Sequence, residues 1–269
     1  MRDDQDRPIP ARDYTKGLFL GGDSAQALHQ RFRTGMDGTG MPAFGPEMSA
    51  QDGWNLVYYM RSLRAPAAPV PTDAVAYGRR IVQERQCSAC HVIEGRGGDV
   101  GPNLDVSATK LHYNWVREFL ADPLSFGKVY PYMPYRMPNL NLSAAEIDAI
   151  VALFAQIARR PLPEPPDPPA RIDESRIADG TLLYFLKCTE CHNLGTVVPT
   201  PEAKRQGPDL INVSRRLRFE FIRGWVNNPR SINPLARMVD TNLTPEEIEA
   251  VTAFVWKTST EAQARAARR

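Results

Sequence analysis

The clearest hydrophobic pattern is a helical repeat of apolar residues near the end of two similar segments. Spacings of three and four residues place these side chains on one face of an α-helix. Each stretch follows a capping box, Ser143 to Glu146 in one segment and Thr244 to Glu247 in the other. The pattern therefore predicts a capped helix at the end of each segment. The apolar positions are Ile147, Ile150, Val151 and Phe154, and then Ile248, Val251 and Val255.

Helical patterns also open both segments, over roughly 73–86 and 174–187. A further one, near residues 49–64, follows a capping-box variant that runs from Ser49 to Asp52. No stretch of useful length alternates apolar and polar residues in the manner of a half-buried strand. The expected fold class is therefore all-α, with helical domains in tandem.

The two segments are copies of one another, and the repeat is the main organising feature of the chain. Cys87 to His91 matches Cys188 to His192, and the matching landmarks continue downstream in the same order. The copies differ in loop length. The first has five extra residues before its methionine, and the second has five extra residues before its glycine–proline pair. The landmarks are Gly101-Pro102 and Gly207-Pro208, Trp115 and Phe221, Phe119 and Trp225, Pro123 and Pro229, and Met137 and Met238.

Proline-rich stretches mark the boundaries between the parts of the chain. Residues 65–71 precede the first copy, and residues 161–169 separate the two copies. Such proline density favours an extended, semi-rigid spacer. We therefore expect two helical domains at 72–160 and 172–262, and a partial module at 1–65.

Composition excludes several classes of function. The chain has 269 residues and a formal charge of +2, without a dense basic run, so a nucleic-acid partner is not expected. No run of about 18 apolar residues is present, so no transmembrane segment is expected either. The first residues are acidic and polar, and they lack the apolar core of a signal peptide. All four cysteines lie in the two repeated motifs, which leaves none for a structural disulfide.

Each motif has the spacing Cys-x-x-Cys-His, which is the attachment signature of c-type haem. Residues three and four apart share one face of a helical turn, so two thiols and one imidazole point the same way. A zinc knuckle and a thioredoxin-like dithiol are the alternatives. Zinc usually takes two Cys-x-x-Cys pairs brought together, and a redox dithiol does not need the histidine. Two motifs with matching downstream landmarks favour haem.

At these residues the chain resembles the class I cytochrome c family, over both copies. The family pattern is a helix, Cys-x-x-Cys-His, a Gly-Pro-x-Leu turn, a methionine and a closing helix. The resemblance implies thioether bonds to two haems and proximal ligation by His91 and His192. It also implies that the carbonyl groups of Pro102 and Pro208 steady the two imidazoles. The four implied thioether residues are Cys87, Cys90, Cys188 and Cys191.

The distal ligands are expected to be methionines. After His192 the second copy has no other histidine or cysteine, and Met238 is its only methionine. In the first copy Met137, Met133 and His112 compete, and Met137 stands at the repeat register before a proline, as in the family. The second copy departs from the family, because Val239 follows its methionine. Met/His ligation fills both axial positions of each iron and raises its potential relative to bis-histidine ligation.

These features predict an electron-transfer protein in a periplasmic or otherwise extracytoplasmic compartment, where c-type haem is attached. The expected partners are redox proteins, in particular other subunits of a respiratory complex. The alternative is a dihaem enzyme, such as a cytochrome c peroxidase or a thiosulfate-oxidising cytochrome. An enzyme of this kind needs an iron that can open, or a different distal ligand.

Residues 1–65 resemble the back half of a further cytochrome c module, in the style of haem subunits of periplasmic respiratory oxidoreductases. Met41-Pro-Ala-Phe44 precedes the capped helix, and no Cys-x-x-Cys-His comes before it in this sequence. Two readings follow. Either an upstream segment supplies a third haem near Met41, or the unit is a degenerate half-domain with a structural role.

Overall fold

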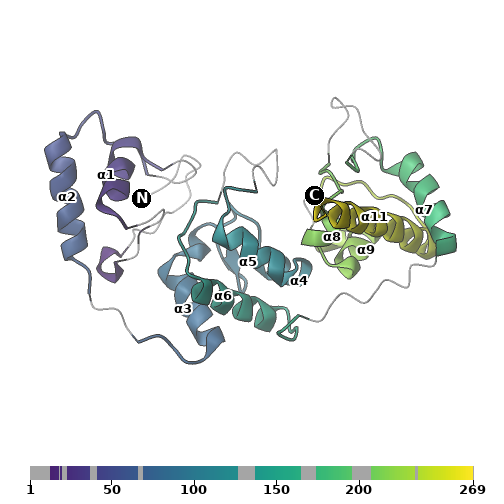
Figure 1. Cartoon of the computed structure of the whole chain (residues 1–269), viewed down its shortest axis with the longest axis horizontal. Helices are drawn as coiled ribbons and strands as arrows, with labels where there is room; N and C mark the ends of the chain where they lie inside the picture. The colour runs from purple at the N-terminus through teal and green to yellow at the C-terminus, as the bar shows by residue number, and fades with distance from the viewer. Residues whose placement is uncertain are drawn as a thin grey trace. The chain divides into compact units, whose positions relative to one another are not determined.

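The computed structural model describes residues 13–17, 19, 23–36, 41–65, 69–126, 137–164, 174–195, 207–233 and 236–268. Within these residues the chain is mostly helical, with one two-stranded sheet, so the predicted all-α class is confirmed (Figure 1). Val92–Ile93 (β1) and Arg96–Gly97 (β2) form this sheet as a short antiparallel hairpin. None of the helices in the described part of the chain is both long and apolar enough to cross a membrane.

The chain divides into two compact units. One contains Met1–Thr109 and Val116–Leu162, and the other contains Lys110–Trp115 and Pro163–Arg269. The short segment 110–115 thus belongs with the second unit, where Leu111 pairs with Leu217 in an isolated antiparallel bridge. The domain limits expected from the sequence stay predictions.

The N-terminal part of the first unit has its own small core. Its helices are α1 (Ala25–Thr34) and α2 (Ala50–Ser62), preceded by the 3₁₀ turn η1 (Tyr14–Lys16). Serine hydroxyl groups cap both helices, since Ser24 accepts from the Ala27 amide and Ser49 accepts from the Asp52 amide, each at 3.1 Å. The buried cluster between them consists of Phe19, Leu28, Phe32, Val57 and Met60.

Two helix pairs form the framework of the two copies. In the first, α3 (Ala74–Glu84) packs on α6 (Ala144–Ile157), and in the second α7 (Glu174–Lys187) packs on α11 (Pro245–Ala266). The helices touch at glycines, since a Cβ atom on Gly78 would lie 2.2 Å from the Ala149 carbonyl oxygen. A Cβ atom on Gly180 would lie 2.1 Å from the Ala250 carbonyl oxygen. Only glycine permits this approach of two backbones.

The predicted helices and caps are present. The helix expected near 73–86 is α3, the one near 174–187 is α7, and α6 and α11 both begin with complete capping boxes. The helices between each glycine–proline pair and methionine were not expected. They are α4 (Leu104–Lys110) and α5 (Tyr113–Ala121) in the first copy, and α8 (Val213–Arg216), α9 (Phe219–Asn227) and α10 (Pro229–Ile232) in the second.

The later helices also match between the copies. Arg117 of α5 donates to Asp148 of α6 at 2.7 Å, and Arg223 of α9 donates to Glu249 of α11 at the same distance. The helix α11 is longer than α6, and its extra turns carry Ser259, which is fully buried. The Ser259 hydroxyl donates to the Ile211 carbonyl at 2.8 Å, which ties the end of α11 to the chain before α8.

Candidate functional site

The first candidate site begins where α3 ends. Gln86 has a left-handed backbone, with φ of 53°, and the chain then enters the 3₁₀ turn η2 (Cys87–Ala89). The amides of Cys90 and His91 both donate to the Cys87 carbonyl, at 3.2 and 3.0 Å. This tight turn keeps both cysteines and the histidine of the motif within one short loop. Cys87 also packs against the buried cluster formed by Val82, Ile93 and Leu153.

A backbone carbonyl holds the imidazole of the first motif. The Nδ1 atom of His91 lies 2.7 Å from the Pro102 carbonyl oxygen. Gly101 lets the two approach, because a Cβ atom there would lie 2.3 Å from His91 Cε1. Since a carbonyl oxygen can only accept, the proton of the neutral ring resides on Nδ1. The Nε2 atom then keeps its lone pair for a metal.

The second motif repeats this arrangement. The His192 amide donates to the Cys188 carbonyl at 2.8 Å, and His192 Nδ1 lies 2.9 Å from the Pro208 carbonyl oxygen. A Cβ atom on Gly207 would again lie 2.3 Å from the ring, at Cε1 of His192. The two copies therefore reach one geometry, although the second has five more residues between histidine and proline.

Burial keeps both imidazoles neutral. It lowers the pKa of His91 and of His192 below the ordinary value, against a smaller opposing effect of each carbonyl contact. Neutral imidazole is the form that binds iron. Burial also raises the pKa of the Cys188 thiol to about 11, so this sulfur stays protonated in the haem-free chain.

The second site has an additional contact that the sequence did not reveal. The Tyr184 side chain has no exposed surface, and its hydroxyl group donates to the His192 carbonyl oxygen at 3.3 Å. Aligning Gly78 with Gly180 places Val82 at the equivalent position of α3, which has no hydroxyl group. Tyr184 precedes Cys188 by one helical turn, and this spacing is the one sequence signal that could have indicated it.

The two candidate distal residues stand in matched loops. Met137 and Met238 are both half-buried, and each precedes by four residues an asparagine with φ of 49°. Those asparagines, Asn141 and Asn242, turn the chain into the capping boxes of α6 and α11. Asn is among the few residues that tolerate this backbone conformation. Met133, the competing residue, lies outside the described part of the chain.

The other histidines have partners of their own. His112 Nδ1 lies 3.5 Å from a Glu164 carboxylate oxygen, within the second unit. His29 stacks on Trp54 with ring centroids 4.2 Å apart, and its Nε2 atom lies 3.3 Å from the Ala50 carbonyl oxygen. Both side chains therefore have contacts within their own units.

The alternative of a zinc site receives no support from the arrangement. In the ranges that the structure describes, no three side chains of histidine, cysteine, aspartate or glutamate come close enough to hold a metal ion. None of the four cysteines forms a disulfide, and each is half-buried.

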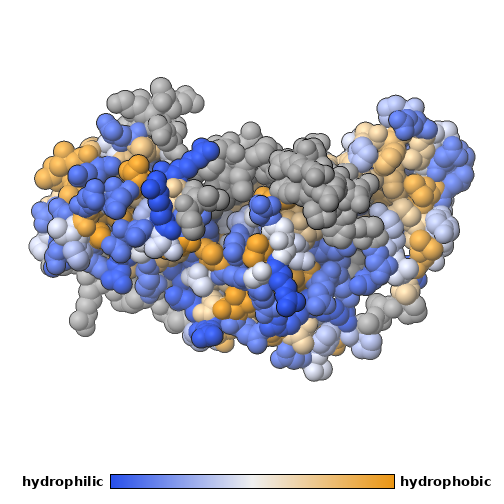
Figure 2. Space-filling model, turned by 180° about the vertical axis from the view of Figure 1, so that it is seen from behind, coloured by the Kyte–Doolittle hydropathy of each residue, from blue (hydrophilic) through white to orange (hydrophobic). Residues whose placement is uncertain are grey.

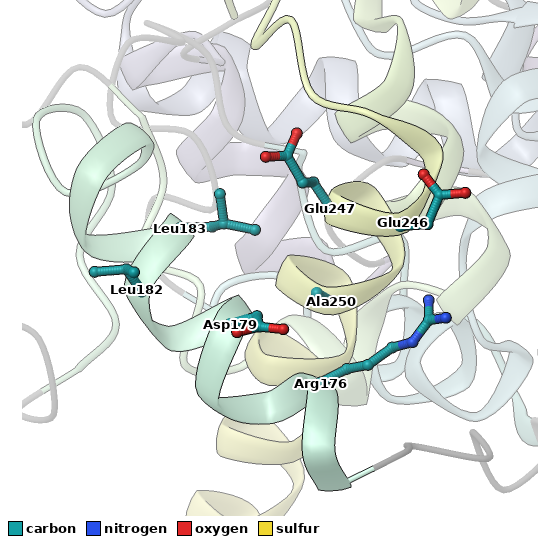
Figure 3. Close-up of a pocket in the computed structure, with 7 residues that line it drawn as sticks. All are labelled: Arg176, Asp179, Leu182, Leu183, Glu246, Glu247 and Ala250. Carbon is teal, nitrogen blue, oxygen red and sulfur yellow. The ribbon is translucent and has the colours of Figure 1, made fainter.

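A groove of about 450 Å³ lies elsewhere, between α7 and the first turns of α11 (Figure 3). Charged side chains of both helices surround it, among them Arg176 and Glu246. None of the motif residues lines it. The groove is therefore separate from the haem-type sites.

Comparison with known proteins agrees with this geometry. The family model for cytochrome c matches residues 75–157, from the second residue of α3 to the last of α6. Residues 75–157 therefore match a cytochrome c domain. Such a domain implies covalently bound haem c and a role in electron transfer. Searches of curated proteins and of solved structures found no match.

The cytochrome c domain contains the first motif, Pro102 and Met137. The family match does not extend to the second copy. Its likeness to the cytochrome c domain rests on the helix pair, the histidine–carbonyl contact and the matched methionine loop.

Proposed function

We propose that this chain is a multihaem c-type cytochrome that carries two covalently attached haems and transfers electrons between redox partners. The observation that carries the proposal is the paired contact of His91 with Pro102 and of His192 with Pro208. Both contacts fix the same imidazole tautomer and leave Nε2 available to iron. A coincidental pair of Cys-x-x-Cys-His sequences would not reproduce this geometry in two separate loops.

The residues fit haem c at both sites. Cys87 and Cys90, and likewise Cys188 and Cys191, would form the thioether bonds. The adjacent histidines would be the proximal ligands. The iron of a bound haem supplies one-electron redox chemistry. The chain contributes the ligands, the glycine-lined approach of the carbonyl groups and the burial of the imidazoles.

Methionine ligation on the distal side favours transfer of electrons over catalysis. Met137 and Met238 stand in matched loops, and with the histidines they would occupy both axial positions of each iron. An iron without an open position does not bind a substrate directly. The chain is then a carrier. Because c-type haem is attached outside the cytoplasm, we propose that it serves an extracytoplasmic respiratory complex.

An apolar helix face supports the proposal of a protein partner. Leu182, Phe185 and Leu186 of α7 are 60%, 51% and 65% exposed, immediately before the second motif. Hydrophobic colour gathers at the edge of the molecule that α7 occupies (Figure 2). The equivalent positions of α3 are polar, namely Arg80, Gln83 and Glu84. The second haem would therefore lie beside the surface that is better suited to docking a redox partner.

A redox titration followed by optical spectroscopy tests the proposed function. The haem-loaded chain should take up two electrons reversibly, and the oxidised form should show the weak long-wavelength band of methionine–iron ligation at both haems. Hydrogen peroxide should be consumed no faster than by free haem peptide. A missing methionine band at one haem, together with rapid peroxide turnover, would instead support a dihaem peroxidase.

A further inference from the structure

The helices α1 and α2 reproduce the second half of both copies. Ser49 caps α2 as Ser143 caps α6, so positions in the helices can be compared by counting from the cap. In α1, Leu28 and Phe32 are buried at a spacing of four residues, as are Val116 and Leu120 of α5. The pair α1–α2 therefore corresponds to α5–α6, and equally to α9–α11.

A contact between the helices supports this correspondence. Five residues after the cap, Asp148 and Glu249 receive hydrogen bonds from Arg117 and Arg223. The same position of α2 is Trp54, and His29 of α1 stacks on it. His29 follows the buried Leu28, just as Arg117 follows the buried Val116. The chemistry differs, but the two helices meet through the same pair of positions.

One face of α2 is exposed, although the corresponding faces of α6 and α11 are covered by α3 and α7. Positions six and ten after the cap are Ala149 and Leu153 in α6, and both are buried at the contact with Gly78 of α3. In α11 the same positions are Ala250 and Phe254, which lie against Gly180 of α7.

In α2 these positions are Asn55 and Tyr59, and both are exposed. Tyr59 is 61% exposed, as is the adjacent Tyr58, whose equivalents Ala152 and Ala253 are buried. Aromatic residues with a polar tip are typical of surfaces that dock another element. The described elements that pack on α2 are α1 and the turn η1, and both contribute to the cluster around Val57 rather than to this face.

We propose that the face formed by Asn55, Tyr58 and Tyr59 is the seat of a helix that ends in a third Cys-x-x-Cys-His motif. The proposal rests on the proposed function, because it assigns the same haem chemistry to a third unit. The occupant is a segment that precedes this sequence in the same polypeptide. In both copies the helix and the motif come before the methionine and the capped helix, and chain order therefore favours an upstream segment over a separate protein.

Charge complementarity identifies the kind of helix that fits. In the first copy Arg85, two residues before the motif, donates to Glu146 at 2.9 Å, three residues after the cap. The second copy has Lys187 directly before its motif and Glu247 at the same position after its cap. The corresponding residue of α2 is Asp52. The incoming helix should therefore carry a basic residue just before its first cysteine.

The third haem would have Met41 on its distal side. Met41 packs against the cluster of Leu28, Phe32 and Val57, and its carbonyl oxygen accepts from the Met36 amide at 3.1 Å. Its loop is longer than those of the copies, with eight residues from Met41 to the cap against six from Met137 to Ser143. Exposure of the α2 face and the position of Met41 thus point to the same missing half-domain.

The experiment uses the complete polypeptide purified from its native source, with haem counted on proteolytic peptides by mass spectrometry. We expect a third haem-bearing peptide, upstream of Met1 and separate from the peptides of Cys87 and Cys188. A complete polypeptide with only those two haem peptides overturns the inference. So does a separate haem protein that cross-links to α2. The absence of haem at Cys87 and Cys188 would count against the proposed function instead.

A variant pair tests the seat itself in the complete polypeptide. Tyr59→Lys should remove the methionine–iron band of the third haem and leave the other two unchanged. Arg33→Gln is the control, because this exposed residue belongs to α1 and is not part of the proposed seat. An unchanged spectrum in Tyr59→Lys would show that the helix docks elsewhere and would overturn the assignment.

Discussion

His192 and Pro208 are 16 residues apart in the sequence, yet the Nδ1 atom of the histidine lies 2.9 Å from the proline carbonyl oxygen. His91 and Pro102, which are 11 residues apart, stand in the same relationship at 2.7 Å. Loops of different length therefore converge on one arrangement of imidazole and carbonyl. This convergence is the physical basis for assigning the same chemistry to both copies.

Gly207→Ala should disturb the second site selectively. The new methyl group would lie 2.3 Å from His192 Cε1, so the ring must move away from the Pro208 carbonyl. Overpacking of this kind costs about 1–3 kcal/mol. We expect a lower potential or lower haem occupancy at the second site, with the first unchanged, as measured by redox titration. Gly224→Ala is the control, since a Cβ atom at this position would lie 3.7 Å from its nearest neighbouring atom. Equal effects of both variants would contradict the role of this contact.

Met238→Ala should open the sixth position of the second iron. No other histidine, cysteine or methionine follows His192, so the chain has no substitute of these types in that copy. We expect a lower potential at that haem and new binding of carbon monoxide to the reduced protein. Optical spectroscopy measures both changes. Met60→Leu, a conservative change in the core of the N-terminal unit, should leave both haems unchanged. An unaltered spectrum in Met238→Ala would mean that another group is the ligand.

Tyr184→Phe removes the hydroxyl group that donates to the His192 carbonyl. A buried hydrogen bond of this type contributes about 1 kcal/mol to stability. We expect a loss of that order in the unfolding free energy of the second domain and a shift in the potential of its haem alone. Val82→Ala, at the equivalent place in the first copy, should instead affect the first haem domain. A shift at both haems in Tyr184→Phe would contradict this assignment.

Glu164 should make the second unit sensitive to acid. Burial would raise the pKa of Glu164, but hydrogen bonds from His112, the Tyr113 amide and Arg218 outweigh burial and lower the pKa to about 2. The folded state thus favours the ionised carboxylate more than the unfolded chain does, since the ordinary pKa of this group is 4.5. The resulting stability is present above about pH 4.5 and is lost as the pH falls towards 2.

Glu164→Gln should reduce the stability of the second unit at pH 7 by about 1–3 kcal/mol, because Arg218, which is 1% exposed, loses its hydrogen-bonded carboxylate partner. Between pH 4.5 and 2 the variant should also show a flatter stability profile than the unmodified chain, measured by denaturant unfolding. Glu249→Gln, at an exposed ion pair, is the control and should change little. Parallel pH profiles for all three proteins would contradict the assignment to Glu164.

The local features of the fold could be predicted from the sequence, and the long-range ones could not. Helix caps such as Ser143 and Thr244 are determined by residues three apart, and the structure contains both as expected. Glu164 was expected to be part of an extended proline-rich spacer. Its bond to Arg218, 54 residues later, depends on tertiary packing that no periodicity reports. The rest of that spacer, residues 165–169, lies outside the described part of the chain.

The same distinction between local and long-range features applies to the two sites. The motif spacing indicated the histidines and cysteines, and the repeat register indicated the methionines. The role of Tyr184 depends on the position of its hydroxyl group against a backbone carbonyl, which an apolar pattern cannot distinguish from simple burial.

The most direct test of the central claim is mass spectrometry of the chain after expression in a host that attaches c-type haem. The account predicts two haem additions that survive denaturation, one on the peptide with Cys87 and Cys90 and one on the peptide with Cys188 and Cys191. A single addition, or haem that is released by acidified acetone, would contradict it.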